Sequence, residues 1–551
     1  MALHIVTSTK TKTILNDTLI WLRNNPDQVV YSLIGDDHSA SELTAKELLQ
    51  GVQSSASTLS GSKRALLIFD TGFEFVYGLL GCFLSRVVAI PVAIPKPRTQ
   101  ELFKHFLEHA QPDAIITTPS LRPRIDQLIP TDIRNTIKLL EVKNEDGSTE
   151  DLEFPDGDEI ALIQYTSGST SHPKGVTISF DNLEHNLHAI KTHFGLNQES
   201  VCFSWLPHYH DMGLIDGLLS PLYNQCKGVI ASPRTVVANP IVWLKAIENF
   251  RVTHTGGPNF ILDLCVDKVN KADAEKLNLS SLTHIYVSAE PVRKNTLDRF
   301  ANHFKSTGFK SNHFTPGYGL AEATLMVTCK SRNAKLNYLS PDNTLATYVG
   351  LGSPIPEIDI QIINPDSGQL LKEGQQGEIV LHGPTITKGY FNDPEKTKEV
   401  NIELHIDGES RAYLRTGDIG LLSDGELFIT GRLKDTIIIR GAQYFAEDLE
   451  YVTSLSSEAF LRSACAAFSI ENSHAEKIII LQEVKKSADK FNADETSERI
   501  RANIFDHFGL SVHNILFLVQ GSIPKTTSGK IRRGECKKLY LDKKLDDSLW
   551  R

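Results

Sequence analysis

The chain has 551 residues, of which 40% are hydrophobic and 23% are charged, and its formal net charge is −10 at pH 7. A single hydrophobic core rarely supports this length, so the sequence predicts more than one domain. The acidic balance argues against a general nucleic-acid-binding protein, because such proteins are normally basic.

Neither a membrane segment nor an export signal is evident in the sequence. No run of about 18 apolar residues occurs, the length that a transmembrane helix requires. Residues 1–13 lack the long apolar core of a secretory signal. The seven cysteines are scattered and form no Cys-x-x-Cys pair, so neither a zinc site nor a disulfide framework is indicated. We therefore expect a cytoplasmic protein with reduced thiols.

A strand–helix–strand unit is the first clear pattern along the chain. Residues 64–70 form a short apolar run, residues 73–84 carry apolar side chains at helical spacing, and residues 87–92 are apolar and β-branched. A helix over 102–110 and a strand over 114–118 continue the alternation. This alternation predicts a parallel sheet flanked by helices, and hence an α/β fold.

Later segments predict further subdomains. The acidic segment 144–159 contains Gly, Pro and Ser and is typical of a surface loop. We expect helices over 241–262 and 291–304. Short strands and turns over 355–430 indicate a β-rich subdomain, and a smaller α+β unit begins near residue 434.

The most informative stretch is Tyr165-Thr-Ser-Gly-Ser-Thr-Ser-His-Pro-Lys-Gly175, which follows an apolar strand. It offers five hydroxyls, glycines that permit close backbone approach and one lysine, which together suit a polyphosphate. It is not a Walker A loop, because Lys174 precedes its glycine. A polar surface turn is the plain alternative. The candidate nucleotide ligands in this stretch are Thr166, Ser167, Gly168, Ser169, Thr170 and Lys174.

This loop resembles the phosphate loop of the acyl-adenylating superfamily, which contains acyl-CoA synthetases, peptide-synthetase adenylation domains and luciferases. Further motifs of that superfamily follow in the expected order, and together they cover nearly the whole chain from about residue 60. They are similar to the adenine and Mg²⁺ segment (Gly317-Tyr-Gly-Leu-Ala-Glu322-Ala-Thr324), the ribose segment (Tyr413-Leu-Arg-Thr-Gly-Asp418), the interdomain hinge (Gly431-Arg432-Leu-Lys434) and the catalytic-lysine loop (Pro524-Lys-Thr-Thr-Ser-Gly-Lys530).

One branch of the superfamily, the fatty acyl-AMP ligases, is the most similar. The matching segments are Trp205-Leu-Pro-His-Tyr-His210-Asp211-Met-Gly-Leu-Ile215, Thr255-Gly-Gly-Pro-Asn-Phe260 and Ser288-Ala-Glu290-Pro-Val292. The resemblance implies that ATP and Mg²⁺ activate a fatty acid as its acyl-adenylate, with release of pyrophosphate. It further implies that the acyl group passes to the phosphopantetheine arm of an acyl carrier protein, often in polyketide or peptide synthesis.

The resemblance assigns roles to individual residues. Glu322 is the expected Mg²⁺ ligand, since magnesium prefers one or two carboxylates plus phosphate oxygens. Asp418 is expected to bind the ribose hydroxyls, with Arg432 adding a contact to ribose or phosphate. Lys530 is the expected catalytic cation between the acyl carboxylate and the α-phosphate. His210 is expected at the acyl site.

Each of these side chains also has an ordinary structural interpretation. Glu322 could be a solvated loop residue, Asp418 a turn residue, Arg432 one half of a surface ion pair, and Lys530 one more lysine of a basic tail. A histidine near aromatic rings, such as His210, is often a packed core residue. Its neighbours His208 and Asp211 are further candidates for the acyl site.

The adenine slot is expected between two short segments, since an aromatic ring beside backbone polar groups suits a purine. The residue before the metal glutamate is often Thr in the superfamily, but here it is Ala321, as is common in fatty acyl-AMP ligases. The α-phosphate donor therefore remains open between Thr324 and the 166–170 loop. The slot residues are Ser288, Ala289, Glu290, Pro291, Tyr318, Gly319 and Leu320.

By the same resemblance, Lys434 is the hinge between two domains. Residues 1–433 are predicted to form a large adenylating domain with parallel α/β sheets and a β-rich subdomain. Residues 434–551 are predicted to form a small mobile α+β lid domain that carries Lys530. One orientation of the lid would bring Lys530 to the site, and another would admit the thiol acceptor.

A basic segment follows Lys530, with seven basic against two acidic residues between 530 and 544. Because carrier proteins are generally acidic, this segment is a candidate docking surface. A solvated helix face is the plain alternative.

Two competing functions stay open at this point. A fatty acyl-CoA synthetase would use the same adenylation chemistry with CoA as the acceptor; residues 330–349 are a candidate position for the insertion that disfavours CoA in fatty acyl-AMP ligases. A non-catalytic nucleotide-binding protein would be expected to lack Glu322 or Lys530, and both are present.

Overall fold

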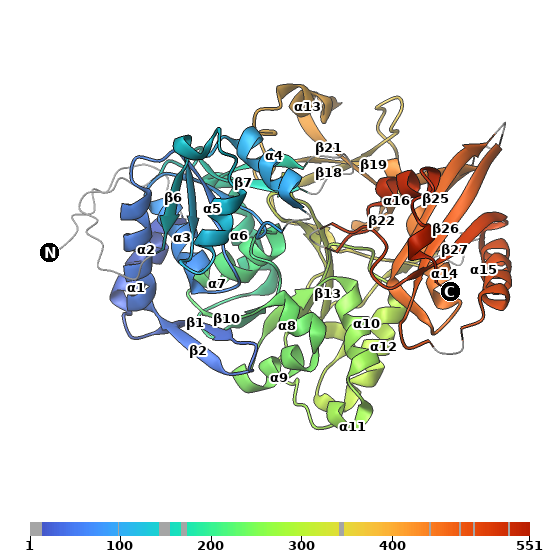
Figure 1. The fold of residues 1–551 in the computed structure, drawn as a ribbon, viewed down its shortest axis with the longest axis horizontal. Coiled ribbons are helices and arrows are strands. Elements are labelled where there is room, and N and C mark those ends of the chain that lie inside the picture. Colours follow the sequence, from blue (N-terminus) through green and yellow to red (C-terminus); the bar gives the residue numbers. More distant parts are fainter. Residues whose placement is uncertain are drawn as a thin grey trace.

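The computed structural model describes residues 14–96, 99–142, 155–166, 173–340, 347–439, 442–472, 475–488, 491–526 and 529–550. The N-terminal helices, the central sheets and a small C-terminal unit follow one another along the long axis of the molecule, with the small unit at one end (Figure 1). The middle of the predicted phosphate loop, residues 167–172, lies outside the described residues, as do most of the predicted loop 144–159 and residues 1–13.

The strand–helix–strand prediction is confirmed. Strand β3 (Arg64–Ile68), helix α3 (Phe73–Leu84) and strand β4 (Val88–Pro91) form a parallel βαβ unit. Helix α4 (Gln100–Ala110) and strand β5 (Ala114–Thr117) continue it. The sheet has the order β6-β5-β3-β4-β7-β8, where the remaining strands are β6 (Lys138–Glu141), β7 (Ile160–Thr166) and β8 (Lys174–Ser179).

Alternating side chains of β3 show how this sheet is buried on both faces. Leu66 and Ile68 pack into a cluster with α4 and with α5 (Arg122–Leu128), whereas Ala65 and Leu67 join the main core on the other face. Strand side chains alternate between faces, so a sheet covered on both sides reads as a continuous apolar run. That main core also holds α2 (Ala45–Leu59) and α3.

A second sheet lies on the far side of these central helices. Its order is β17-β14-β13-β12-β11-β9-β10-β1-β2, and the strands from β13 to β1 run parallel. The strands are β1 (Val29–Ile34), β2 (Ala40–Thr44), β9 (Val201–Ser204), β10 (Lys227–Ala231), β11 (His254–Gly257), β12 (His284–Val287), β13 (Phe314–Gly319), β14 (Met326–Cys329) and β17 (Ser353–Pro354).

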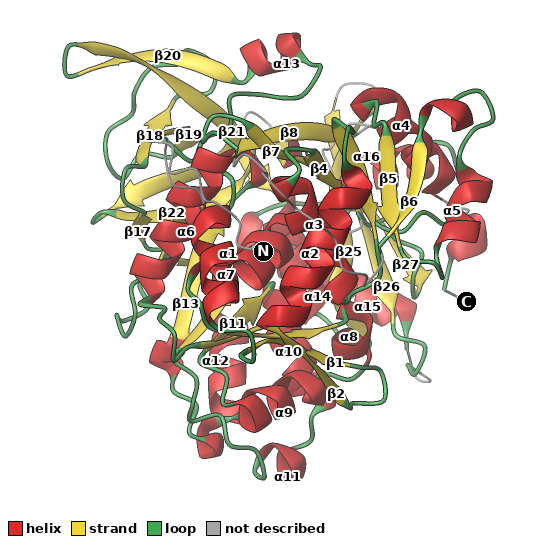
Figure 2. Cartoon of the chain, turned by 90° about the vertical axis from the view of Figure 1, so that its left-hand side faces the viewer, coloured by secondary structure: helices red, strands yellow, loops and turns green. Residues whose placement is uncertain are grey.

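Helices pack on both faces of this second sheet. The inner layer contains α1 (Ile14–Asn24), α6 (Phe180–Phe194), α7 (Ser220–Tyr223) and a π-helix over Met212–Leu219. The outer helices gather at the bottom of the molecule (Figure 2). They are α8 (Pro233–Ala238), α9 (Ile241–Phe250), α10 (Asn259–Lys268), α11 (Lys271–Ala274) and α12 (Lys294–His303).

One helix prediction is wrong in its middle. Residues 241–262 form not one helix but α9, strand β11 and the first turn of α10. Helix α9 ends because Arg251 takes a left-handed conformation with φ 53°. The β-branched and glycine residues that follow then form a buried parallel strand. The second predicted helix, 291–304, is confirmed as α12.

The predicted β-rich subdomain is confirmed over residues 359–432. Its order is β18-β19-β21-β20, and β22 pairs with β21 through a tight turn at Asp424 and Gly425, both at positive φ. The elements are β18 (Asp359–Ile363), β19 (Gly377–His382), α13 (Pro394–Glu399), β20 (Asn401–Ile406), β21 (Glu409–Ser423) and β22 (Glu426–Arg432).

The C-terminal α+β unit has hydrophobic clusters of its own. The buried members of its two clusters all lie at Ile437 or later, whereas those of the other clusters end at Leu427. The C-terminal unit therefore has hydrophobic packing separate from that of the preceding residues. The unit contains β23 (Thr436–Ile439), β24 (Ala442–Phe445), α14 (Ala446–Leu455), β25 (Phe460–Asn472), β26 (Ala475–Val484), α15 (Ala493–Phe508), β27 (Val512–Val519) and α16 (Arg533–Leu541).

None of the helices in the described part of the chain combines the length and the apolar character that a bilayer crossing requires.

Candidate active site

The predicted site residues converge where the large sheet, the β-rich subdomain and the small C-terminal unit meet. Strands β12 and β13 end at Val287 and Gly319, and ligands of open α/β sheets bind beyond such carboxyl ends. Asp418 and Arg432 lie on β21 and β22. The Lys530 loop enters from the small unit.

Asp418 is the most firmly held of these residues. Its side chain is buried, and Tyr318 Oη donates to Asp418 Oδ2 at 2.7 Å. Arg432 lies directly across the strand pair, and its Nε is 2.7 Å from Asp418 Oδ1. Each carboxylate oxygen can accept more than one hydrogen bond, so Asp418 can still bind two ribose hydroxyls. Burial, followed by the Asp418 charge, raises the pKa of Tyr318 well above its usual value.

Glu322 belongs to a second network, which contains a residue that sequence reasoning missed. Tyr390 Oη donates to Glu322 Oε1 at 2.8 Å, and Lys174 Nζ lies 5.6 Å from the centre of the Tyr390 ring. Tyr390 therefore joins the predicted metal ligand to the lysine of the phosphate loop. No local signal around Tyr390 points to this role, because it depends on a contact between distant segments.

The Glu322 carboxylate fits a magnesium ion that phosphate oxygens also hold. Tyr390 bonds to Oε1, and no donor from the described residues bonds to Oε2. In the part of the chain that the structure describes, no three His, Cys, Asp or Glu side chains are grouped to hold a metal. A single carboxylate with one oxygen open to a further ligand fits the usual coordination of Mg²⁺, which commonly takes one or two carboxylates beside phosphate oxygens and water.

The two candidates for the α-phosphate donor differ in what the structure shows of them. Thr324 has φ 69°, is 1% exposed, and its hydroxyl donates to the carbonyl oxygen of Thr385 at 2.7 Å. That hydroxyl is therefore already committed to the backbone. Thr166 and Lys174, which are paired across β7 and β8, flank the phosphate loop. Ser167, Gly168, Ser169 and Thr170 lie outside the described residues.

The predicted adenine slot lies beside these groups. Ser288 N donates to the Gly257 carbonyl, and Ala289 has the unusual φ of 69° for a residue with a side chain. Pro291 is exposed. At the other wall, an added Cβ on Gly319 would lie 1.9 Å from the Leu325 carbonyl oxygen, so this position tolerates only glycine. Ala321 is buried and Leu320 packs on the core.

Among the predicted adenine-slot residues, Glu290 has an unusual electrostatic environment. Its Oε1 accepts a hydrogen bond from the Phe260 amide at 2.5 Å. Burial raises the pKa of Glu290 to about 7, although that bond and the charges of Lys530 and Lys525 act in the opposite direction. A carboxyl group with a pKa near neutrality, close to two lysines, is unusual and is typical of functional sites.

Lys530 reaches this site from the small unit. The charges of Asp211, Asp418 and Glu290 all act on it and favour its protonated form. Its surroundings nevertheless lower its pKa, first through desolvation and then through Arg432. Part of its surface is exposed. Lysine, arginine and three carboxylates thus interact electrostatically, although they come from segments far apart in the sequence.

His210 and its neighbours form the wall next to Lys530. Desolvation and then the charge of Lys530 lower the pKa of His210 to about 4, so the imidazole is neutral at pH 7. Asp211 Oδ1 accepts from the Met212 amide at the start of the π-helix, at 2.8 Å. His208 is 4% exposed and packs against Phe75, which favours the core interpretation for this one residue.

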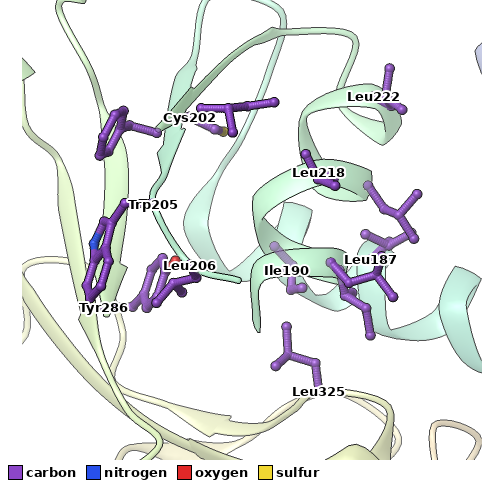
Figure 3. Packing of buried hydrophobic residues seen from close by; sticks show 14 of the residues in the cluster. Leu187, Ile190, Cys202, Trp205, Leu206, Leu218, Leu222, Tyr286 and Leu325 are labelled. Carbon is purple, nitrogen blue, oxygen red and sulfur yellow. The ribbon is translucent and has the colours of Figure 1, made fainter. Parts of the chain in front are cut away.

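Trp205, which lies in the same segment as His210, belongs to an apolar cluster. Trp205 and Tyr286 lie on the strand side, opposite Leu218 and Ile190 of the inner helices (Figure 3). Trp205 Nε1 donates to the Gly256 carbonyl at 3.1 Å, and the Trp205 and Phe260 rings meet edge to face. An added Cβ on Gly257 would lie 2.7 Å from Trp205.

Lys434, the predicted hinge, lies in the short 3₁₀ turn Leu433–Asp435 between β22 and β23. Desolvation and the nearby Arg432 charge lower its pKa. The predicted hinge residue is therefore only two residues from Arg432, which pairs with Asp418.

Comparison with known proteins agrees with this geometry. Residues 20–391 match the AMP-binding enzyme family, and residues 434–548 match the family described as Disco-interacting protein 2-like, AMP domain. The medium-chain-fatty-acid–[acyl-carrier-protein] ligase JamA from Moorena producens is 36% identical over 88% of this chain and 87% of its own length.

Two further proteins help to place the chain. FadD21 of Mycobacterium tuberculosis, which is named for fatty-acid–CoA ligation, is 31% identical over 87% of both chains. A fatty acyl-adenylate ligase from L. pneumophila, solved in complex with acyl adenylate and pyrophosphate, superposes with a TM-score of 0.73 at 32% identity over 96% of both chains.

Proposed function

Because the chain belongs to the AMP-binding enzyme family, we propose that it activates a fatty acid with ATP and passes the acyl group to an acyl carrier protein. The observation that carries this proposal is that Lys530 lies near enough to the paired Asp418 and Arg432 for both charges to act on it. We divide the chain into a large adenylating domain, residues 1–433, and a small lid domain, residues 434–551, with Lys434 at the hinge.

In the first half-reaction, a carboxylate oxygen of the fatty acid attacks the α-phosphorus of ATP. The bond from that phosphorus to the bridging oxygen of pyrophosphate breaks, and acyl-adenylate and pyrophosphate form. Two anions must meet, so the site has to neutralise charge and fix geometry. Lys530 supplies a cation where the acyl carboxylate and the α-phosphate approach one another, and Asp418 holds the ribose.

Glu322 is the residue that would hold Mg²⁺, and a bound Mg²⁺ supplies further neutralisation of the phosphate charge. Tyr390 positions the Glu322 carboxylate through the 2.8 Å hydrogen bond. Lys174 Nζ lies over the face of the Tyr390 ring, and this contact keeps the cation close to the phosphate loop.

In the second half-reaction, the thiol sulfur of a phosphopantetheine arm attacks the acyl carbonyl carbon. A thioester forms, the thiol proton passes to water, and AMP leaves with the electron pair of the broken C–O bond. Because His210 is neutral, its side chain can form part of an uncharged wall that contacts the acyl group next to Lys530. Similarity to JamA, an acyl-carrier-protein ligase by name, supports a carrier protein as acceptor.

A fatty acyl-CoA synthetase is the second candidate, and similarity to FadD21 favours it. The two functions share the adenylation step and differ in the acceptor. To separate them, purified protein is incubated with ATP, Mg²⁺ and radiolabelled fatty acids of graded length, with and without CoA. Acyl-AMP that persists with CoA supports the carrier-protein function, and efficient acyl-CoA formation supports the synthetase. No adenylate with any fatty acid would contradict both.

The structure modifies the predicted docking surface for an acidic carrier. Arg533 turns inward and pairs with Glu450, and Arg532 pairs with Glu535. Four lysines remain for the docking role on and after α16, of which all but Lys537 are exposed. They are Lys537, Lys538, Lys543 and Lys544.

We expect reversal of these four lysines to Glu to slow acyl transfer to the carrier about tenfold, with adenylation unchanged, because long-range attraction speeds docking. A matched control reverses four exposed lysines of the large domain, Lys245, Lys276, Lys305 and Lys372, and so gives the same net charge. Equal slowing in both proteins, or none in either, would contradict the docking surface.

A further inference from the structure

A buried ionic contact joins the adenine-slot side of the large domain to the small domain. Arg293 Nη1 lies 2.9 Å from Asp448 Oδ1, and Arg293 Nη2 donates to the Glu447 carbonyl at 3.0 Å. Tyr348 Oη donates to Asp448 Oδ2 at 3.1 Å, and the guanidinium lies over the Tyr451 ring at 4.6 Å. The side chains of Arg293 and Asp448 are only 12% and 9% exposed.

Arg293 is anchored on the nucleotide side of this contact. It lies two residues after Pro291 of the predicted adenine slot. Its backbone amide donates to Asn259 Oδ1 at 3.0 Å, and Asn259 is buried at the start of α10. The position of its guanidinium is therefore set by the same segment that lines the slot.

Helix α14 connects this contact to the catalytic-lysine loop. One side of the helix presents Asp448 to Arg293, whereas Glu450 binds Arg533 through two bonds of 2.7 Å. Arg533 Nη1 also reaches Asp435 Oδ2, next to the hinge, at 2.7 Å. Helix α14 thus carries one ionic contact to the large domain and another to Arg533, which follows Lys530 by three residues in the chain.

We propose that Arg293 and Asp448 are positioning residues for Lys530, whose contact holds the small domain in the orientation that forms the adenylate. This rests on the proposed two-step function. The contact exists only while α14 faces the large domain, so its strength biases the equilibrium between domain orientations. It should favour the first half-reaction and oppose the reorientation that the second requires. Because the contact between Arg293 and Asp448 is mostly buried, salt screens it only weakly.

The test measures the two half-reactions separately in Arg293→Ala, Asp448→Asn and Tyr348→Phe. We expect pyrophosphate release to fall at least tenfold in the first two and about twofold in the third, while transfer from supplied acyl-adenylate stays the same or rises. Asp448→Asn is decisive, because it leaves the nucleotide side of the contact untouched. Arg293→Lys, which keeps the charge but loses the planar fork, should restore part of the rate.

Lys294→Ala is the matched control. Lys294 neighbours Arg293 but pairs with Asp298 of its own helix, so it should leave both half-reactions unchanged. Equal loss in both half-reactions of Asp448→Asn, or loss in neither, would overturn the proposal.

Domain orientation provides a readout that does not depend on activity. All seven native cysteines are buried, so spin labels can be placed at Glu275→Cys and Asp506→Cys, which are exposed positions on the two domains. Asp448→Asn should broaden the label distance distribution, and an unchanged distribution would contradict a positioning role. If the wild-type protein forms no acyl-adenylate, the proposed function fails, but the distances still decide whether the contact sets the orientation.

Discussion

Asp418 and Lys530 lie near enough for their charges to interact, but neighbouring strands fix the first, whereas a loop of the C-terminal unit carries the other. Asp418 is buried and held at 2.7 Å by both Tyr318 and Arg432. Lys530 is exposed and lies three residues before Arg533, which Glu450 of α14 binds. We therefore propose that the ribose site is preformed, while the catalytic cation can be withdrawn. An enzyme with two half-reactions needs that difference, since the lysine is required in only one of them.

The largest expected effect comes from removing the delivered cation. Lys530→Ala should lower adenylate formation about 10²–10³-fold, the usual cost of losing one transition-state charge partner. Acyl transfer from supplied acyl-adenylate should change less than about twofold. Pyrophosphate release and product chromatography measure the two steps. Lys486→Ala, an exposed lysine of the same domain, is the control. Equal loss in both steps would contradict the proposed difference between Asp418, which is fixed, and Lys530, which can be withdrawn.

Asp418→Asn should have the next largest effect, about 10–100-fold, the range for lost hydrogen bonds to a charged group. Because the ribose stays bound throughout, both half-reactions should suffer and the KM for ATP should rise. Steady-state kinetics and AMP binding check this. Asp424→Asn, at the exposed turn of the same hairpin, should leave activity intact. A defect limited to adenylation would show that Asp418 acts on the chemistry rather than on the nucleotide.

Tyr390→Phe tests whether the metal side of the site is also preformed. It removes the hydroxyl that holds Glu322 Oε1 but keeps the ring under Lys174. We expect adenylation to fall about three- to tenfold, the cost of one hydrogen bond, with a higher Mg²⁺ requirement. A magnesium titration at saturating ATP gives the result. An unchanged magnesium dependence would show that Glu322 needs no such support.

The smallest expected effect is on stability and concerns Glu290, whose pKa is influenced by Lys530. The pKa of Glu290 is raised to about 7 in the folded chain, from 4.5. A raised carboxyl pKa favours folding at low pH, and that contribution is lost as the pH rises from about 4.5 to 7. Glu290→Gln, which keeps an acceptor for the Phe260 amide, should raise the unfolding midpoint by about 1–2 °C at pH 8 and not at pH 4.5. Thermal scans at both pH values check this; equal shifts at both would contradict it.

Much of the fold could be predicted because it depends on local patterns. The βαβ unit, the β-rich subdomain and helix α12 follow from apolar spacing and turn residues that lie next to each other in the chain. The single helix over 241–262 is wrong because β-branched and glycine residues, which favour a strand, separate two apolar helical segments. Parallel pairing with the distant strand β12 makes His254–Gly257 part of the sheet.

The sequence by itself determined the family and the identity of the candidate site residues, because their spacing within short motifs is local information. Only the tertiary structure decided which of them meet. The charge of Asp418 acts on Lys530 although 111 residues separate them in the chain, and Tyr390 reaches Glu322 from another subdomain. Such contacts join segments far apart in the chain, and their geometry is set by packing and buried charge, which no local pattern records.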